Sequence, residues 1–150
     1  MDSLILSRTT REDVPSIRVI ERLSFPSPWD SITIMRTISD RGSFNLTARY
    51  QGRVVGYVFS VSMRKMVHLL NLAVHPEFRR RGIGRRLLSE IISFARSTRK
   101  SYVFLEVRTS NDSARKLYAS MGFSPVLTWR RYYSDTGDDA AVMVKHIERD

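Results

Sequence analysis

A cluster of arginines around a pair of glycines is the part of this sequence best suited to hold an anion. The segment Arg79–Arg86 reads RRRGIGRR and lies between a strand-like segment, Leu69–Val74, and a helical apolar pattern that begins at Ile83. Glycines at a strand-to-helix junction let the backbone turn tightly and expose its amide N–H groups, and the first turn of a helix carries positive partial charge. Long cationic side chains there favour a phosphate-rich ligand over a lone carboxylate. The alternative for this segment by itself is a solvated basic turn.

One acid lies inside a strand-like segment that is otherwise suited to burial. Glu106 occurs in the continuous β-prone run Tyr102–Val107, which predicts a central strand covered on both faces. A carboxylate in such a position is either paired with a cation, for which Arg108 is a nearby candidate, or used in chemistry. The chemistry open to it is proton transfer, because an amine must lose a proton before it can act as a nucleophile.

Two polar residues share one face of a predicted helix. Asn111 and Tyr118 are seven positions apart, so their side chains lie roughly 10 Å apart along the helix axis. A ligand that runs along this face would meet both of them. The structural alternative is that Asn111 caps the helix and Tyr118 is a core aromatic residue, and a cap can also contact a ligand.

Apolar spacing and turn residues predict the elements that position these side chains. We expect strands at Leu4–Leu6, Phe44–Tyr50, Val54–Met63, Val67–Val74, Tyr102–Val107, Val126–Tyr133 and Ala140–Ile147. We expect helices at Val14–Leu23 after a cap at Thr10, at Asp30–Ser39, at Ile83–Ser97 and from the Asn111 cap to Gly122. This order of strands and helices predicts one α+β domain that spans residues 1–150.

Composition narrows the class of protein. The chain has 150 residues, 42% of them hydrophobic, and no cysteine, which excludes disulfides, thiolate metal sites and a cysteine nucleophile. No segment approaches the ~20 apolar residues that span a bilayer, and no signal peptide begins the chain, so we expect a cytoplasmic protein without membrane contacts. The net charge of +10 suits nucleic acid, an acidic peptide or a polyphosphate cofactor, and does not choose among them.

Spacing also excludes several common sites. No Gly-Lys-Ser/Thr follows the glycine pair, so it is not a P-loop, and Leu87 stands where a Rossmann fingerprint needs its third glycine. The histidines His68, His75 and His146 lack metal-ligand spacing, so we expect no metal and treat them as structural or surface residues.

Four longer segments carry a resemblance to a known family. The string LLNLAVHPEFRRRGIGRRLL, from Leu69 to Leu88, resembles the acetyl-coenzyme A signature of the GNAT superfamily of N-acetyltransferases. The resemblance continues through FPSPW at Phe25–Trp29, LEVRTSNDSARKLYASMGF at Leu105–Phe123 and RRYY at Arg130–Tyr133. Together these segments resemble the RimI-like branch, the ribosomal-protein alanine and related protein N-terminal acetyltransferases. This implies a mixed, mostly antiparallel sheet of about seven strands flanked by about four helices, with one parallel strand pair splayed apart.

The resemblance implies that acetyl-coenzyme A is the co-substrate. Main-chain groups of Leu72, Ala73 and Val74 would pair with its pantetheine arm as an added strand would. The residues implied around its pyrophosphate are Arg79, Arg80, Arg81, Gly82, Ile83, Gly84 and Arg85. Asn111 and Tyr118 would also contact this ligand.

The resemblance also assigns the catalytic and acceptor residues. Glu106 would act as general base and Tyr118 would protonate the departing thiolate, while main-chain N–H groups near Leu72 steady the oxyanion of a direct attack. The residues implied to contact the acceptor are Phe25, Trp29, Tyr132 and Tyr133. From the residues alone, any of these four aromatics could instead belong to the core.

We therefore expect an enzyme that acetylates the N-terminal α-amino group of a protein or peptide. One alternative is acetylation of a lysine Nε or a small-molecule amine on the same fold, because the cofactor motif binds only the donor. Another is a basic nucleic-acid-binding module, which would not need Glu106 or the spacing of Asn111 and Tyr118. A ribosomal protein is a candidate acceptor, and its basic tail would require a locally acidic or apolar groove in this basic chain. The sequence makes no prediction about oligomeric state.

Overall fold

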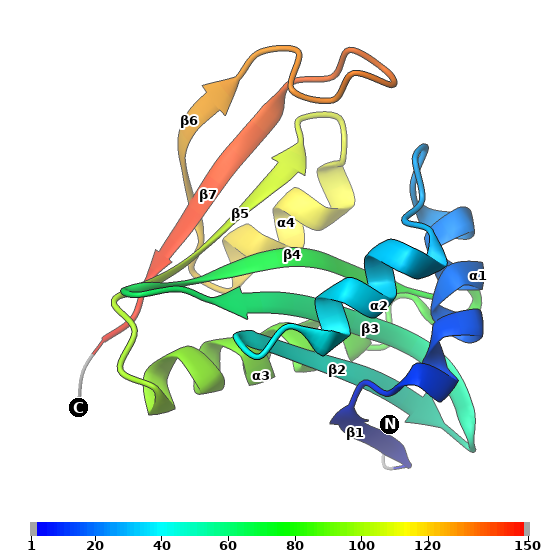
Figure 1. The fold of residues 1–150 in the computed structure, drawn as a ribbon. Helices are drawn as coiled ribbons and strands as arrows, with labels where there is room; N and C mark the ends of the chain where they lie inside the picture. Colours follow the sequence, from blue (N-terminus) through cyan, green and yellow to red (C-terminus); the bar gives the residue numbers. More distant parts are fainter. Residues whose placement is uncertain (1–2, 149–150) are drawn as a thin grey trace.

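A computed structural model describes residues 3–148, which form one seven-stranded sheet with four α-helices around it (Figure 1). The strands are β1 (Leu4–Arg8), β2 (Ser43–Tyr50), β3 (Arg53–Ser62), β4 (Met66–Val74), β5 (Tyr102–Arg108), β6 (Ser124–Trp129) and β7 (Ala140–His146). The helices are α1 (Val14–Ser24), α2 (Ser31–Ser39), α3 (Ile83–Ser97) and α4 (Asp112–Ser120), with short 3-10 helices at Arg11–Asp13 and Pro76–Phe78. The predicted α+β class is confirmed.

The sheet is split at one end. Its strand order is β1-β2-β3-β4-β5-β7-β6, and every neighbouring pair is antiparallel except β4 and β5, which are parallel. This parallel pairing joins only Met66–His68 to Tyr102–Phe104. Beyond these residues β4 and β5 diverge, as Figure 1 shows. The expected splayed parallel pair is therefore present, and it opens on the side of Leu72 and Glu106.

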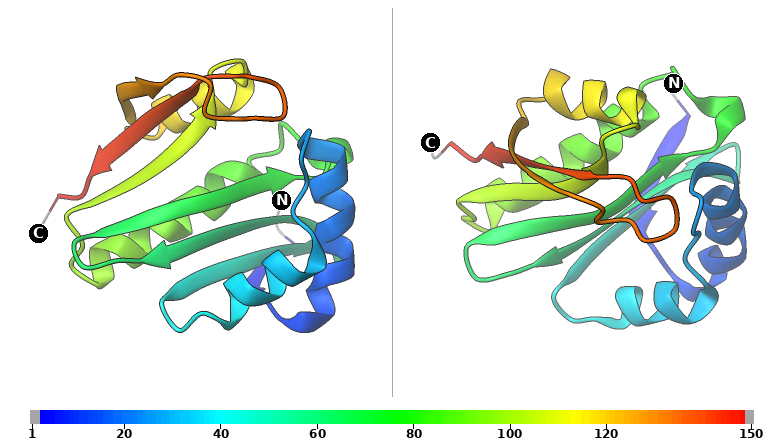
Figure 2. Two further views of the ribbon diagram at one scale, coloured as in Figure 1. Left: turned by 45° about the horizontal axis from the view of Figure 1, so that its top comes forward. Right: turned by 90° about the horizontal axis from the view of Figure 1, so that it is seen from above.

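Helices cover both faces of the sheet. Figure 2 shows α1 and α2 on one face and α3 on the other. The α3 residues that face the sheet are buried and recur at helical spacing: Ile83, Leu87, Leu88, Ile91, Ile92 and Ala95. Burying each large aliphatic side chain contributes about 1.5–3 kcal/mol, so this stripe fixes α3 against the sheet. α3 begins and ends at the predicted residues.

The last two predicted strands need one correction. β6 ends at Trp129, whereas the prediction extended it to Tyr133. Arg131 has a φ of 52°, which an extended strand does not allow, and its N–H donates to Asp139 Oδ1 at 2.9 Å. Tyr132 and Tyr133 therefore lie in the β6–β7 loop.

The prediction that β5 is covered on both faces is wrong. Val103, Leu105 and Val107 are buried, but Phe104 and Glu106 on the opposite face are only partly buried. The α1–α2 layer packs mainly on β2, β3 and β4. The Glu106 side of β5 consequently borders a cavity instead of a helix.

Smaller predictions about helix starts are confirmed or shifted by one residue. The Thr10 N–H donates to Asp13 Oδ2 at 3.0 Å, as the capping pattern predicts, although a 3-10 helix separates it from α1. Asp30 lies outside α2 because its Oδ1 accepts from Thr33 N (2.8 Å) as the helix cap. Between residues 3 and 148, no helix is both long enough and apolar enough to cross a membrane.

Candidate active site

The split between β4 and β5 exposes a strand edge where a β-bulge also lies. Phe59 pairs with Asn71 and Ser60 pairs with Leu69, so Leu70 is the extra residue of β4. A bulge turns the side chains next to it and interrupts the ladder. After His68, β4 has no partner on its β5 side. Its main-chain groups there are available to an extended ligand, as on any sheet edge.

A first cavity, of about 350 Å³, lies in the split. We call it the acidic cavity because its charged lining residues are Glu21, Glu106 and Asp135 with a single cation, Arg108. Arg108 is already neutralised: its guanidinium donates to Asp135 Oδ2 at 2.8 Å and lies 3.5 Å from Asp138 Oδ2. Arg108 and Asp135 therefore cancel each other, which leaves the carboxyl groups of Glu21 and Glu106 in the lining. These make the cavity acidic although the chain as a whole carries a net charge of +10.

A second cavity, of about 810 Å³, adjoins the first between β4, α3 and α4. We call it the arginine cavity. Most of the residues predicted around the phosphates and the pantetheine line it: Leu72, Ala73, Val74, Arg79, Arg80, Gly82, Ile83, Gly84, Arg85, Asn111 and Tyr118. Arg81 does not line it, and its guanidinium lies over the Phe78 ring at 5.1 Å. The sequence reasoning missed further lining residues: Ser24, Phe78, Ser113, Lys116, Leu117 and Ser120.

The turn at the mouth of the arginine cavity has the backbone that its glycines predict. Gly82, the cap of α3, has a φ of 82°, a conformation that favours glycine. The first main-chain hydrogen bond of α3 runs from Arg86 N to Gly82 O at 3.1 Å. The N–H groups of Ile83, Gly84 and Arg85 thus have no acceptor within the helix, and they carry its positive dipole end. This arrangement fits an anionic group such as a pyrophosphate.

The second glycine of the motif serves packing. A Cβ on Gly84 would lie 3.3 Å from Leu117 of α4 and 3.8 Å from Leu72 of β4. Without a side chain there, α3, α4 and β4 can approach one another around the cavity. Arg79 and Arg85 are held across its rim, where Arg79 Nη2 donates to Ser24 Oγ (3.2 Å) and Arg85 Nη1 donates to Ser120 Oγ (2.8 Å).

Glu106 pairs with a histidine and not with Arg108, which corrects the expected structural partner. Glu106 Oε2 lies 2.7 Å from His68 Nε2, and the two side chains are 13% and 22% exposed. His68 stacks on Phe104 with ring centroids 4.1 Å apart. His68 therefore belongs to the site, although sequence spacing gave it no role. The contact depends on the parallel register, which places His68 opposite Phe104, two residues before Glu106.

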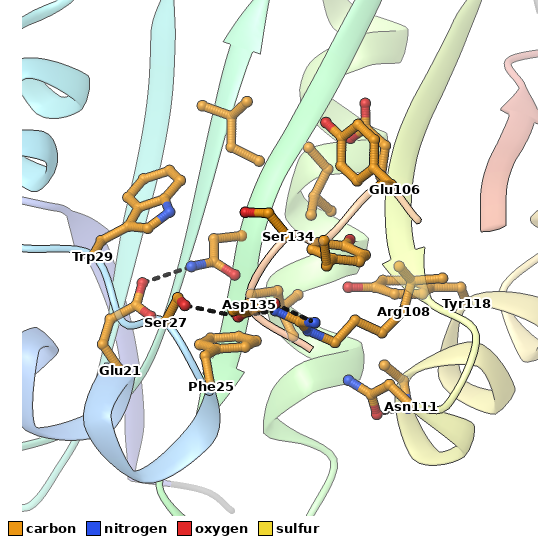
Figure 3. A pocket seen from close by; sticks show the side chains of 18 residues that line it. Glu21, Phe25, Ser27, Trp29, Glu106, Arg108, Asn111, Tyr118, Ser134 and Asp135 are labelled. Carbon is orange, nitrogen blue, oxygen red and sulfur yellow. Dashed lines mark hydrogen bonds and ion pairs between the residues drawn. The ribbon is translucent and has the colours of Figure 1, made fainter. Parts of the chain in front are cut away.

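Tyr118 lies where the two cavities meet. The residues that line both are Phe25, Leu72, Asn111, Ala114 and Tyr118. The Tyr118 ring is 5% exposed and packs on Phe123 with centroids 5.8 Å apart. Its hydroxyl points toward the centre of the cavity in Figure 3. Burial raises the pKa of Tyr118 far above its usual value, so the hydroxyl stays protonated and can donate.

Asn111 is the cap of α4, as one of the two predictions for it required. Its Oδ1 accepts from Ala114 N at 3.2 Å, so it caps α4. It also lines both cavities at the start of the helix that carries Tyr118.

The four aromatic residues expected near the acceptor all line the acidic cavity: Phe25, Trp29, Tyr132 and Tyr133. Trp29 stacks on Phe59 at 5.6 Å, and the Arg108 guanidinium lies 4.0 Å from the centre of the Tyr133 ring. Burial raises the pKa of Tyr133 to about 12.

Two loops join across this cavity. Ser27 Oγ, in the α1–α2 loop, donates to Asp135 Oδ2 of the β6–β7 loop at 2.7 Å (Figure 3). Asp135 also accepts from Arg108, and these two donors hold its pKa far below the usual range. We refer to Ser27, Arg108 and Asp135 as the loop clamp.

Comparisons with known proteins show the family of the chain. Residues 10–123 match the family model of the acetyltransferase (GNAT) family. The chain is 35% identical to N-alpha-acetyltransferase RimI of Mycobacterium tuberculosis, and the match covers 95% of this chain and 92% of that protein.

Solved structures of acetyltransferases have a similar fold. The crystal structure of the ribosomal-protein-S18-alanine N-acetyltransferase from Escherichia coli superposes with a TM-score of 0.90 at 28% identity, covering 98% of this chain and 96% of that one. The structure of yncA from Salmonella typhimurium with its cofactor acetyl-CoA has a TM-score of 0.84 at 21% identity, covering 99% of this chain and 96% of that one. The second likeness concerns the fold alone.

Proposed function

The chain belongs to the acetyltransferase (GNAT) family, and from this premise we propose that it transfers acetyl from acetyl-coenzyme A to the N-terminal α-amino group of a protein or peptide. The observation that carries the proposal is the meeting of two chemically different cavities at Leu72 and Tyr118. One cavity suits an anionic donor and the other suits a cationic acceptor.

The arginine cavity fits the donor. The free N–H groups at the start of α3 and the arginines around them would hold the pyrophosphate. The unpaired edge of β4 at Leu72–Val74 would hold the amide-containing arm. Acetyl-coenzyme A bound in this way supplies the thioester where the two cavities meet.

The acidic cavity fits the acceptor. An α-amine with a pKa of about 8 arrives largely as an ammonium ion at neutral pH. The Glu106 carboxylate attracts that cation, and the surrounding aromatic residues contact the first side chains of the peptide. The acidic lining also meets the requirement that a basic acceptor tail places on this basic chain.

The acceptor ammonium loses two protons, one before the attack and one from the nitrogen of the tetrahedral intermediate, and the thiolate gains one. The first proton passes through Glu106 to solvent, and the second restores the Tyr118 hydroxyl after Tyr118 has protonated the thiolate. Glu106 accepts the amine proton, and the amine nitrogen forms a bond to the thioester carbonyl carbon. Main-chain N–H at Leu72–Ala73 stabilises the oxyanion. The C–S bond then breaks, and Tyr118 donates its proton to the thiolate. His68 holds the Glu106 carboxylate toward the cavity through their 2.7 Å contact.

A panel of matched peptides tests the acceptor class. One peptide has a free N-terminus and no lysine, one has an acetyl-blocked N-terminus and an internal lysine, and one has both groups blocked. We expect acetylation of the first peptide alone, read as a mass increase mapped to the first residue. Acetylation confined to the lysine of the blocked peptide would show that the acceptor is a side-chain amine.

A further inference from the structure

A buried carboxyl next to the acidic cavity has no role in the mechanism above. Glu21 is 0% exposed and lies on the apolar face of α1 beside Ile17 and Ile20. Burying a carboxyl costs free energy unless hydrogen bonds compensate it, and a leucine would fill the same space without that cost. Glu21 Oε2 and the neighbouring Tyr57 hydroxyl have no hydrogen-bond partner within the part of the chain that the structure describes.

The hydrogen bond that Glu21 does make leads into the cavity. Its Oε1 accepts from Asn71 Nδ2 at 2.6 Å, which is the dashed line drawn from Glu21 in Figure 3. Asn71 belongs to the bulged part of β4 and pairs with Phe59, a core residue of the α1–α2 face. Asn71 is partly buried and lines the acidic cavity. Glu21 also borders this cavity, and its hydrogen bond there runs to Asn71.

The contact fixes which end of the Asn71 amide a ligand meets. A carboxamide is planar, with a donor on one side and an acceptor on the other. Because Nδ2 is engaged by Glu21, Oδ1 is turned away from α1 and is the atom left for the cavity. Asn71 thus offers an incoming ligand a hydrogen-bond acceptor.

We propose that Asn71 Oδ1 accepts a hydrogen bond from the α-amine of the acceptor, and that Glu21 is the positioning residue that holds the Asn71 carboxamide in this orientation. This inference rests on the proposed function. Asn71 immediately precedes Leu72, whose main chain lies at the meeting point of the two cavities. One bulged stretch of β4 would then orient both reactants, with Leu72 on the thioester and Asn71 on the amine.

A hydrogen-bond acceptor such as Asn71 Oδ1 suits an amine in particular as the ligand. An ammonium ion has three N–H bonds, and Glu106 takes one of these protons. A second N–H held by Asn71 Oδ1 keeps the nitrogen beside the thioester carbonyl carbon after Glu106 has taken its proton. An acceptor atom at this place would not help a ligand that lacks an N–H.

Steady-state kinetics with the free N-terminal peptide tests the inference. Asn71→Leu removes Oδ1 with little change in volume, and we expect the peptide KM to rise about tenfold, the size of effect that losing one hydrogen bond gives. The Kd of acetyl-coenzyme A, measured by calorimetry, should stay within about twofold because Asn71 does not line the arginine cavity.

Glu21 variants separate positioning from a purely structural role. Glu21→Leu should raise the peptide KM as Asn71→Leu does while leaving the melting temperature at pH 8 unchanged or higher. Glu21→Gln keeps an oxygen that accepts from Asn71, so its peptide KM should be close to that of the wild type. The double variant Glu21→Leu/Asn71→Leu should be no worse than Asn71→Leu alone, because Glu21 acts through Asn71.

Two results would overturn the inference. One is an unchanged peptide KM in Asn71→Leu for a peptide that the wild type acetylates on its α-amine. The other is additive losses in the double variant. If the wild type acetylates lysine and not the α-amine, the proposed function fails first and this inference falls with it, so the wild-type peptide panel distinguishes the two failures.

Discussion

The arginine cavity and the acidic cavity differ in how the chain builds them. The arginine cavity takes most of its lining from one stretch, Leu72–Arg85, and from α4, with Ser24 and Phe25 at its edge. The acidic cavity collects side chains from α1, the α1–α2 loop, β4, β5, α4 and the β6–β7 loop. Recognition of the donor is thus local in sequence, whereas recognition of the acceptor depends on the whole fold. Variants can therefore disable one cavity and leave the other intact.

The largest effects should come from Glu106 and Tyr118, the two residues to which proton transfer is assigned. Glu106→Gln and Tyr118→Phe should each lower kcat by about 10²–10⁴-fold, because general acid–base groups contribute this much. The Kd of acetyl-coenzyme A should hardly change. Matched controls are Glu90→Gln, on the exposed side of α3, and Tyr102→Phe, which lines neither cavity. Wild-type kcat in Glu106→Gln or Tyr118→Phe would contradict the assigned role of that residue.

A bulky side chain at one of the two glycines should weaken the binding of acetyl-coenzyme A and leave peptide binding unchanged. In Gly84→Leu the new side chain would collide with Leu117, which lies 3.3 Å from the Cβ position. We expect the Kd of acetyl-coenzyme A to rise about 100-fold, which corresponds to about 2.7 kcal/mol. Ser93→Leu, at an exposed position of the same helix, controls for the added bulk. Tight acetyl-coenzyme A binding by a folded Gly84→Leu variant would place the donor elsewhere.

Breaking the loop clamp should weaken peptide binding and leave the binding of acetyl-coenzyme A unchanged. Arg108→Met removes the donor that Asp135 and Asp138 share and the cation over the Tyr133 ring. With the loop released, the peptide KM should rise about tenfold, because ordering the loop then opposes binding. Acetyl-coenzyme A affinity should be unaffected, and Arg96→Met serves as a surface control. Equal losses for both ligands would show that the two cavities are not separable.

A smaller effect, on stability, should follow from Glu21. Burial raises its pKa to about 7 from the ordinary 4.5. A carboxyl with a raised pKa in the folded state binds its proton more tightly there than in the unfolded chain. Its contribution to stability is therefore full below about pH 4.5 and is lost as the pH rises toward 7. Glu21→Gln cannot titrate, so its melting temperature should exceed that of the wild type by a few degrees at pH 8 and by less at pH 5.

Melting curves at several pH values check this prediction. The groups around Glu21 are Arg18 on the same helix, Tyr57 on β3, Asn71 on β4 and the main chain of Trp29. A difference between Glu21→Gln and wild type that stays constant from pH 5 to pH 8 would mean that Glu21 does not titrate in this range.

The contrast between the cavities also explains what the sequence could predict. α3 and the turn before it were predicted correctly because apolar periodicity and glycine placement are local signals. Glu106 was singled out as an acid in an apolar strand and Tyr118 by its helical spacing from Asn111, while their catalytic roles came from the resemblance to the family. His68 was missed because its contact with Glu106 joins residues 38 positions apart through the β4–β5 register.

The acceptor side shows the same dependence on tertiary structure. Glu21 and Asn71 are 50 positions apart, and each looks ordinary in its own element. Ala114 and Leu117 could have been predicted as cavity residues from the sequence, because they follow Asn111, the cap of α4, at three-residue steps. Tyr132 and Tyr133 line the acidic cavity, but their strand assignment was wrong because the break at Arg131 leaves no mark in the apolar pattern.

The central claim is that the two cavities hold donor and acceptor together at one junction. A conjugate that links coenzyme A through an acetyl group to the α-amine of a peptide tests this directly by calorimetry. We expect it to bind about 100-fold more tightly than coenzyme A alone, because linking makes the second binding event intramolecular. A conjugate through a lysine Nε should gain much less. Binding of the α-amine conjugate no tighter than that of coenzyme A would contradict the account.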